Sequence, residues 1–187
     1  MPEKLLRHVT IHAHGTWLHG DPRGFRSRDH RIHSSGDYKN PPPTGEHAGL
    51  HRFHRERSDP PTYFPTELWP TLGNVLVRYL IDESHRVLIV SVSKTHVHLL
   101  VELPTPLEKV KEIIGFAKSR SSRAVKDEMP GSIWGEGGDF EPVLSAGHEA
   151  NAFLYIQDEQ GPAWTWTHLD PLPPELPPRR ATRHKKR

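Results

Sequence analysis

The sequence predicts a single α+β domain in which helices flank a central antiparallel sheet. Its length of 187 residues is that of one ordinary domain. Residues 86–93 and 95–103 are rich in aliphatic and β-branched side chains, and the short turn at Lys94 indicates that these two strands form a hairpin. Apolar side chains recur at helical spacing over residues 66–83 and 107–127, so a helix is expected on either side of the hairpin along the chain.

Composition limits the kind of protein this can be. Only 34% of the residues are hydrophobic, and 19 prolines and 14 glycines predict long irregular segments. The absence of cysteine excludes disulfides, thiolate metal sites and cysteine nucleophiles. No apolar run approaches the roughly 18 residues of a membrane span, and the N-terminus lacks the apolar core of a signal peptide. We therefore expect a cytoplasmic protein.

Charge and histidine content give a weaker indication of function. The formal net charge is only +2, but residues 179–187 hold six lysines and arginines and no acid. Such a tail is either a phosphate-binding arm or a solvated terminus. The chain also has 15 histidines, and histidine is both a common metal ligand and a common general base.

The N-terminal third combines one predicted strand with a long irregular segment. Residues 8–18 partly alternate between apolar and polar side chains and predict the first strand. Residues 19–65 form an insertion rich in arginine and histidine, with a short helix expected near residues 45–56. Loops of this length are usually functional or disordered. After the insertion, Thr66 is the expected N-cap of the following helix.

The C-terminal third is predicted to complete the domain and then leave it. Residues 130–147 are glycine-rich and contain a short strand, and a helix is expected from about residue 147 to residue 160. The proline-rich residues 163–187 are expected to be a spacer followed by the basic tail. We therefore place the single domain at residues 1–162.

Two histidines on the second strand of the hairpin are the first candidate site residues. His96 and His98 are two positions apart, so both imidazoles leave the same face of the sheet, while Val97 and Leu99 point to the core. Two histidines can hold a divalent cation if a third ligand comes from elsewhere. The alternative is a pair of satisfied or solvent-facing histidines without a metal.

A tyrosine and a carboxylate on the last predicted helix strengthen the metal interpretation. Tyr155 and Glu159 are four positions apart and therefore neighbours on one helical face. A glutamate would complete a site with two histidines, and a tyrosine beside it is a usable covalent nucleophile. The alternative is that Tyr155 and its apolar neighbours are ordinary packing residues.

These residues resemble a known family. The apolar strand with His-Val-His-Leu-Leu-Val resembles the HUH motif of one-tyrosine transposases, the insertion-sequence-200-like enzymes and the REP-associated tyrosine transposases. Residues 117–123 resemble the helix after that motif, Ile133-Trp134 with Phe140 the next strand, and residues 153–156 the helix with the catalytic tyrosine. The order and spacing agree from about residue 72 to residue 161.

The resemblance implies a fold and a mechanism. The fold is that of HUH endonucleases, which is similar to ferredoxin and RRM domains. His96 and His98 would bind Mg²⁺ or Mn²⁺, and Tyr155 would attack a phosphate of single-stranded or hairpin DNA. The product would be a 5′-phosphotyrosine link and a free 3′-OH, in DNA transposition or REP-element mobilisation. A homodimer with a shared active site and a monomer are both compatible with the family.

The third ligand departs from the family pattern. The family commonly has a glutamine four residues after the tyrosine, where this chain has Glu159 and places Gln160 one residue later. Glutamate is a competent oxygen ligand, so Glu159 is assigned first. Gln160 is the fallback, because position i+5 points about 140° away from position i on an ideal helix.

Basic residues supply the candidate DNA contacts. Positive side chains on the helix after the hairpin are expected to contact phosphates, which positions DNA without reading its sequence. Arginines of the insertion could hold a DNA hairpin. The candidates are Lys118, Arg120 and Arg123 on the helix and Arg23, Arg26 and Arg28 in the insertion.

Four other interpretations remain open. A degenerate member of the family could bind DNA hairpins without cutting them. A replication initiator or relaxase would share the HUH motif but often has a lysine or a second tyrosine near the nucleophile. A histidine-rich zinc protein would bind Zn²⁺ without affinity for DNA. Within the chain, His12 and His14 form a second His-x-His pair and a rival metal site.

Overall fold

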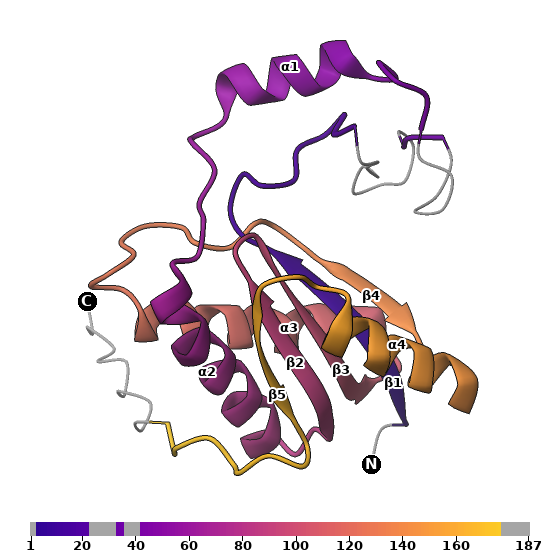
Figure 1. Cartoon of the computed structure of the whole chain (residues 1–187), viewed down its shortest axis with the longest axis vertical. Coiled ribbons are helices and arrows are strands. Elements are labelled where there is room, and N and C mark those ends of the chain that lie inside the picture. Colours follow the sequence, from indigo (N-terminus) through magenta and orange to yellow (C-terminus); the bar gives the residue numbers. More distant parts are fainter. Residues whose placement is uncertain (1–2, 23–32, 36–41, 177–187) are drawn as a thin grey trace, which may run out of the picture.

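The computed structural model in Figure 1 describes residues 3–22, 33–35 and 42–176 and contains one sheet with helices packed against it. A one-turn 3-10 helix, η1, precedes the second α-helix. In chain order the elements are β1 (Lys4–His12), α1 (Ala48–Arg57), η1 (Thr66–Leu68), α2 (Trp69–Asp82), β2 (Val87–Ser93), β3 (His96–Pro104), α3 (Leu107–Ala124), β4 (Asp139–Pro142), α4 (Ala146–Asp158) and β5 (Ala163–Thr167).

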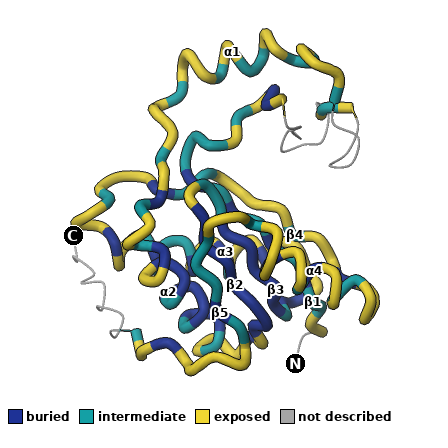
Figure 2. Tube along the Cα trace, viewed as in Figure 1, coloured by how far each residue is buried: buried dark blue, intermediate teal, exposed yellow. Residues whose placement is uncertain are grey.

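The sheet has five strands in the order β4-β1-β3-β2-β5, and all neighbours are antiparallel. The predicted hairpin of β2 and β3 lies at its centre and is buried along its length (Figure 2). The α+β class and the central antiparallel sheet are therefore confirmed. No helix in the described part of the chain is long and apolar enough to span a membrane.

The two faces of the sheet have different coverings. Alternate residues such as Val9, Val97 and Leu99 form the main core with apolar side chains of α2 and α3. On the opposite face, Leu100 belongs to a smaller cluster with Ile156 of α4. Because α4 is short and has only two buried residues, part of this second face stays available for polar side chains.

Two predicted boundaries near the N-terminal half are wrong. The first strand was expected at residues 8–18, but it begins at Lys4 and pairs with β3 along its whole length before it ends at His12. Its first residues, Lys-Leu-Leu-Arg, do not alternate between apolar and polar side chains, which conceals the strand pattern in the sequence. Thr66 is not an N-cap, because it lies inside the 3-10 turn and Pro65 precedes it without a side-chain cap.

The predicted domain boundary at residue 162 is also wrong. Ala163–Thr167 form the edge strand β5, which pairs with β2, and Trp164 and Trp166 pack against the main core. The sequence Ala-Trp-Thr-Trp-Thr alternates with a period of two, so both tryptophans reach the same face. Gly73 of α2 permits this contact, since a Cβ there would lie 1.9 Å from the Trp164 ring.

Candidate active site

His96 and His98 lie on the face of β3 opposite the main core, as the strand pattern predicts. Val97 and Leu99 between and beyond them are fully buried on the other side. The two imidazole rings have their centroids 4.9 Å apart and are nearly perpendicular. Both rings therefore stand together on the face that α4 only partly covers.

The neighbouring strand β1 adds two histidines that sequence reasoning did not assign to this site. The antiparallel register places Thr10 opposite His98 and His12 opposite His96. His8 Nε2 lies 2.9 Å from His98 Nδ1, and the His12 ring centroid is 6.1 Å from that of His96. The signal was the spacing of His8, Thr10 and His12 at every second position in a strand.

The rival pair of His12 and His14 is not a unit in the structure. β1 ends at His12, so the alternation that would place the two side chains on one face does not extend to His14. The backbone N–H of His14 instead donates to Ile133 O in the turn that follows. His12 thus belongs with His96, while His14 lies in the next segment.

Helix α4 brings Tyr155 to the histidines of the same chain. Ser145 caps the helix by accepting from the N–H of His148, and Ile156 anchors it in the small core. Tyr155, which directly precedes Ile156, has its ring centroid 5.6 Å from that of His98 and 5.9 Å from that of His8. Tyr155 remains 40% exposed, so its ring is open to a ligand in solution.

The structure places Gln160 and not Glu159 at the histidines. Gln160 Oε1 is 3.2 Å from His96 Nε2, and Gln160 Nε2 donates to Tyr155 O. The ranking of Glu159 before Gln160 assumed an ideal helix through residue 160, and the structure differs from that assumption. Helix α4 ends at Asp158 and Glu159 is its C-cap, so the chain turns there and directs the glutamine back to β3.

The hydrogen bonds of His96 define its protonated nitrogen. An amide oxygen only accepts, so His96 donates from Nε2 to Gln160 Oε1. The hydroxyl of Thr95 then donates to His96 Nδ1 over 2.9 Å. If Nε2 instead bound a metal, the proton would move to Nδ1 and the same hydroxyl would accept it. Thr95 thus supports either state of the ring.

Burial keeps the inner histidines neutral. Desolvation lowers the pKa of His98 to about 2, with further lowering from His96, His8 and His12, while a hydrogen bond to Gln160 opposes the shift. Desolvation also lowers the pKa of His8, and Glu141 and Asp139 oppose it. A neutral imidazole keeps a lone pair on one ring nitrogen, which can bind a metal ion or accept a proton.

A comparison with known families bears on what this cluster does. Residues 62–158, just over half of the chain, match the family described as IS200-like transposases. The chain belongs to the IS200-like transposase family. The matched range includes His96, His98 and Tyr155, and it leaves out β1, Gln160 and β5. A search of curated proteins found no match to this transposase.

The donor set of the transposase fits a divalent metal only if Gln160 takes part. Within residues 3–22, 33–35 and 42–176, no three histidine, aspartate or glutamate side chains are placed to hold a metal ion by themselves. His96 and Gln160, however, bring an imidazole nitrogen and an amide oxygen within 3.2 Å of each other, beside His98. Nitrogen and oxygen donors of this kind suit first-row and alkaline-earth divalent ions.

The basic residues predicted on α3 lie away from the cluster. Helix α3 packs on the main core, which is across the sheet from the histidines. Lys118 is half-buried there, and its Nζ donates to Gly135 O and Gly137 O over 2.7 and 2.8 Å. Burial lowers its pKa to about 8. Lys118 therefore holds the loop between α3 and β4, and a DNA contact through Lys118 would lie across the sheet from the histidines.

The remaining predicted DNA contacts are placed only in part. Arg120 is half-buried and Arg123 is exposed, both on α3 and so on the same side as Lys118. Arg23, Arg26 and Arg28 lie outside the described residues. For this transposase, the surface that meets DNA near the histidines has to be sought on other elements.

Proposed function

We propose that this transposase cleaves and rejoins single-stranded DNA through a covalent link to Tyr155. The observation that supports it is the meeting of two distant segments, β3 and the chain at the end of α4, in which Tyr155 lies beside His98 and Gln160 reaches His96. The substrate is a hairpin-bearing single strand, cut in DNA transposition or REP-element mobilisation. This function needs a solvent-accessible nucleophile beside polar side chains, and it is supported by Tyr155, which is 40% exposed and lies beside His8 and His98.

The metal ligands are His96, His98 and Gln160, with Mg²⁺ or Mn²⁺ as the ion. When bound, such an ion polarises the scissile phosphate and stabilises the charge that develops on it. Other side chains contact the second ring nitrogen of each histidine. Thr95 and Ser93 contact His96 Nδ1, and His8 and Thr10 contact His98 Nδ1. Partners of this kind fix the tautomer and the ring orientation of a ligating histidine.

The chemical step requires only one bond to be exchanged for another. Tyr155 Oη forms a bond to phosphorus as the bond from phosphorus to the 3′ oxygen breaks. The tyrosine proton leaves, the 3′ oxygen gains a proton, and the 5′ phosphate stays on Tyr155. Attack by another 3′-OH reverses the step and rejoins DNA. Because one phosphodiester replaces another, no external energy source is needed.

A covalent-adduct assay tests this function. The purified protein is mixed with labelled hairpin oligonucleotides from the DNA that flanks its gene, with Mn²⁺ or EDTA, and the products are separated on a denaturing gel. We expect a metal-dependent protein–DNA band that is absent with Tyr155→Phe and His98→Ala. Tyr155→Phe is the sharper variant, because it keeps the ring and removes only the nucleophilic oxygen. Retarded DNA on a native gel without any adduct would instead indicate a hairpin-binding protein that does not cut.

The third ligand is tested with two adjacent variants. Gln160→Ala should lower Mn²⁺ affinity and adduct formation at least about tenfold. Loss of a residue that only hydrogen-bonds to a metal ligand already costs about this much. Glu159→Ala is the matched control, because it removes an exposed side chain next to it in the chain. If Glu159→Ala causes the larger loss, the assignment of Gln160 is wrong while the cleavage mechanism stands.

A further inference from the structure

Two segments form a lobe over the end of the sheet that holds the histidines. We call residues 13–22 together with residues 42–63 the arm. Figure 1 shows that the arm leaves the sheet where β1 ends and that α1 stands apart from the other helices. Almost all of the arm lies outside the range that matches the family model, which begins at residue 62. The match to the family model therefore assigns no role to the arm.

Close backbone contacts hold the two segments of the arm together. Gly15 and Gly20 both have positive φ values, and a Cβ on Gly20 would lie 2.5 Å from His51 N of α1. The N–H of Thr62 donates to His14 O, and that of Ala13 donates to Thr95 O. These contacts tie the arm to the turn between β2 and β3. The arm is thus a defined lobe next to His96.

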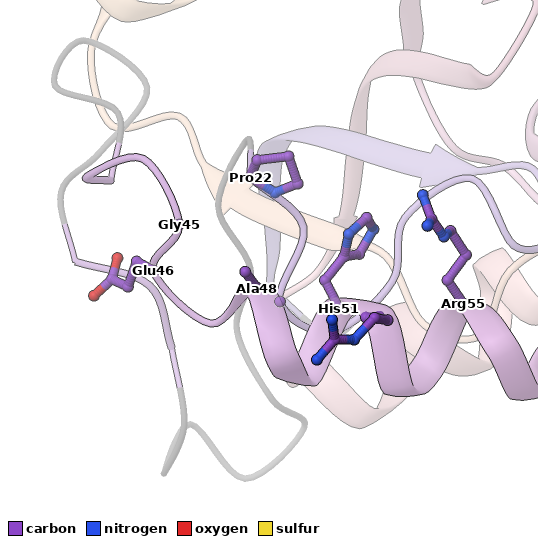
Figure 3. A pocket seen from close by; sticks show the side chains of 8 residues that line it. Pro22, Gly45, Glu46, Ala48, His51 and Arg55 are labelled. Carbon is purple, nitrogen blue, oxygen red and sulfur yellow. The ribbon is translucent and has the colours of Figure 1, made fainter.

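The arm and this turn line an open hollow of about 460 Å³. Its lining includes Leu18, Tyr63 and Thr95, with His51 and Arg55 from α1. The last two also line a smaller hollow of about 220 Å³, where Figure 3 shows them rising from the same side of α1 toward Pro22. The larger volume is enough for a nucleobase, and its mixture of apolar and polar groups is typical of ligand sites.

The larger hollow begins one residue from the histidine cluster. Thr95 lines it and also contacts His96 Nδ1 at 2.9 Å. At its rim Tyr63 is 49% exposed, and Lys94 Nζ lies 4.8 Å from the centre of the Tyr63 ring. Exposed aromatic rings beside positive charges are the groups that bind single-stranded nucleic acid, through base stacking and phosphate contacts.

The two sides of the cluster differ in charge, because the β4 strand contributes acids and the arm side contributes bases as well as acids. On β4, Asp139 pairs with Thr10 and Glu141 pairs with His8, so both acids share the face of the histidines. A polyanion is repelled there. Toward the arm, Lys94 and Arg55 are available at the rim and in the lining. A strand bound at the histidines therefore continues toward the arm.

We propose that the arm binds the single-stranded DNA next to the scissile phosphate, with one nucleobase in the larger hollow stacked on Tyr63 and a backbone phosphate on Lys94. This proposal rests on the proposed function, since it names how the strand leaves the same site. Asp21 and Asp59 also line the hollow. Asp21 is buried, whereas the exposed Asp59 can accept a hydrogen bond from a base edge, and phosphates bind at the basic rim.

A binding measurement without metal tests the proposal. All variants carry Tyr155→Phe, EDTA is present, and anisotropy of fluorescein-labelled oligothymidylate reports affinity. Tyr63→Ala should weaken binding at least about fivefold, the lower end of the loss for one stacked base, and Tyr63→Phe should restore it. Phe53→Ala is the matched control, because Phe53 is 50% exposed on α1 and lines neither hollow. Equal affinities of the Tyr63→Ala and Phe53→Ala variants would overturn the proposal.

A second probe locates the base. 2-Aminopurine is placed at successive positions of the hairpin oligonucleotide, and stacking quenches its fluorescence. Quenching at one position that is lost in Tyr63→Ala supports the proposal, and quenching that is unaffected by Tyr63→Ala contradicts it. The adduct assay separates the two proposals. Adducts with unchanged binding by Tyr63→Ala would refute only the arm, and Tyr63-dependent binding without adducts would refute only the cleavage.

Discussion

His96 and His98 each have Nδ1 engaged by residues of β1, β2 or the turn between β2 and β3, and Nε2 of His96 contacts Gln160 Oε1. For His98 the engaged atom is within 2.9 Å of His8 Nε2 and 3.1 Å of Thr10 Oγ1. Nε2 of a neutral His8 can accept a hydrogen bond from the His98 Nδ1–H, and the lowered pKa of His8 favours that neutral form. At the scale of single residues, His8 is therefore a positioning residue for the proposed metal ligand.

Replacement of His8 should lower the affinity for metal more than it lowers the stability of the fold. His8→Phe keeps a ring of similar size and removes the acceptor for His98 Nδ1. We expect Mn²⁺ affinity to fall about 10- to 100-fold, the usual cost of losing such a partner. Titration calorimetry in the absence of DNA measures it, with His14→Phe as a control outside the cluster. Unchanged Mn²⁺ affinity in His8→Phe would show that Thr10 alone orients His98.

Acid should destabilise the fold through His98. Its pKa is lowered to about 2 in the folded chain from an ordinary value of 6.5, so the unfolded chain binds more protons between these two pH values. Stability is then unaffected by His98 above pH 6.5 and falls as the pH drops below it. Urea unfolding at a series of pH values measures this slope. In His98→Gln the slope should be shallower, and an identical slope would mean that His98 is protonated in the fold.

At the scale of elements, the sequence predicted type better than boundaries. The hairpin, both long helices and α4 were found because their apolar side chains follow strand or helix periods. The start of β1 was missed because Lys-Leu-Leu-Arg does not alternate between apolar and polar side chains, and β5 was missed because prolines follow it. Gln160 was ranked second because helix periodicity says nothing about the chain beyond a helix end. Pairing across strands, which joins His8 to His98, is likewise absent from local patterns.

Contact between α2 and β5 depends on a single glycine. A Cβ on Gly73 would lie 1.9 Å from the Trp164 ring, while one on Gly115 in α3 meets no atom within 4 Å. Gly73→Ala should lower the free energy of unfolding by about 1–3 kcal/mol through overpacking. Gly115→Ala should raise it by about 0.5–1 kcal/mol, because alanine favours a helix interior. Urea titration compares the two, and equal effects would place the Trp164 ring elsewhere.

At the scale of the whole molecule, the sheet ends at one edge with β5, and the arm extends from the end of β1 near the histidines. β5 covers the edge of β2, and Leu176 packs on the main core after it. Arg78 of α2 donates to Pro173 O and holds this segment against the helix. The residues that follow α4 thus belong to the folded unit, although they include many prolines.

Truncation tests this extent of the fold. A chain that ends at residue 162 loses β5, so β2 becomes an unprotected edge and Trp164 and Trp166 no longer cover the core. We expect it to aggregate or to lose its cooperative thermal transition by circular dichroism. A chain that ends at residue 176 keeps every described contact and should retain the transition. If the chain that ends at 162 unfolds at the same temperature as the chain that ends at 176, β5 is an appendage and the domain ends with α4.

Adduct formation by the chain that ends at residue 176 tests the basic tail separately. Preserved adducts at saturating DNA with weaker DNA affinity are expected if residues 179–187 only attract phosphates, because such contacts add affinity without touching the reacting atoms.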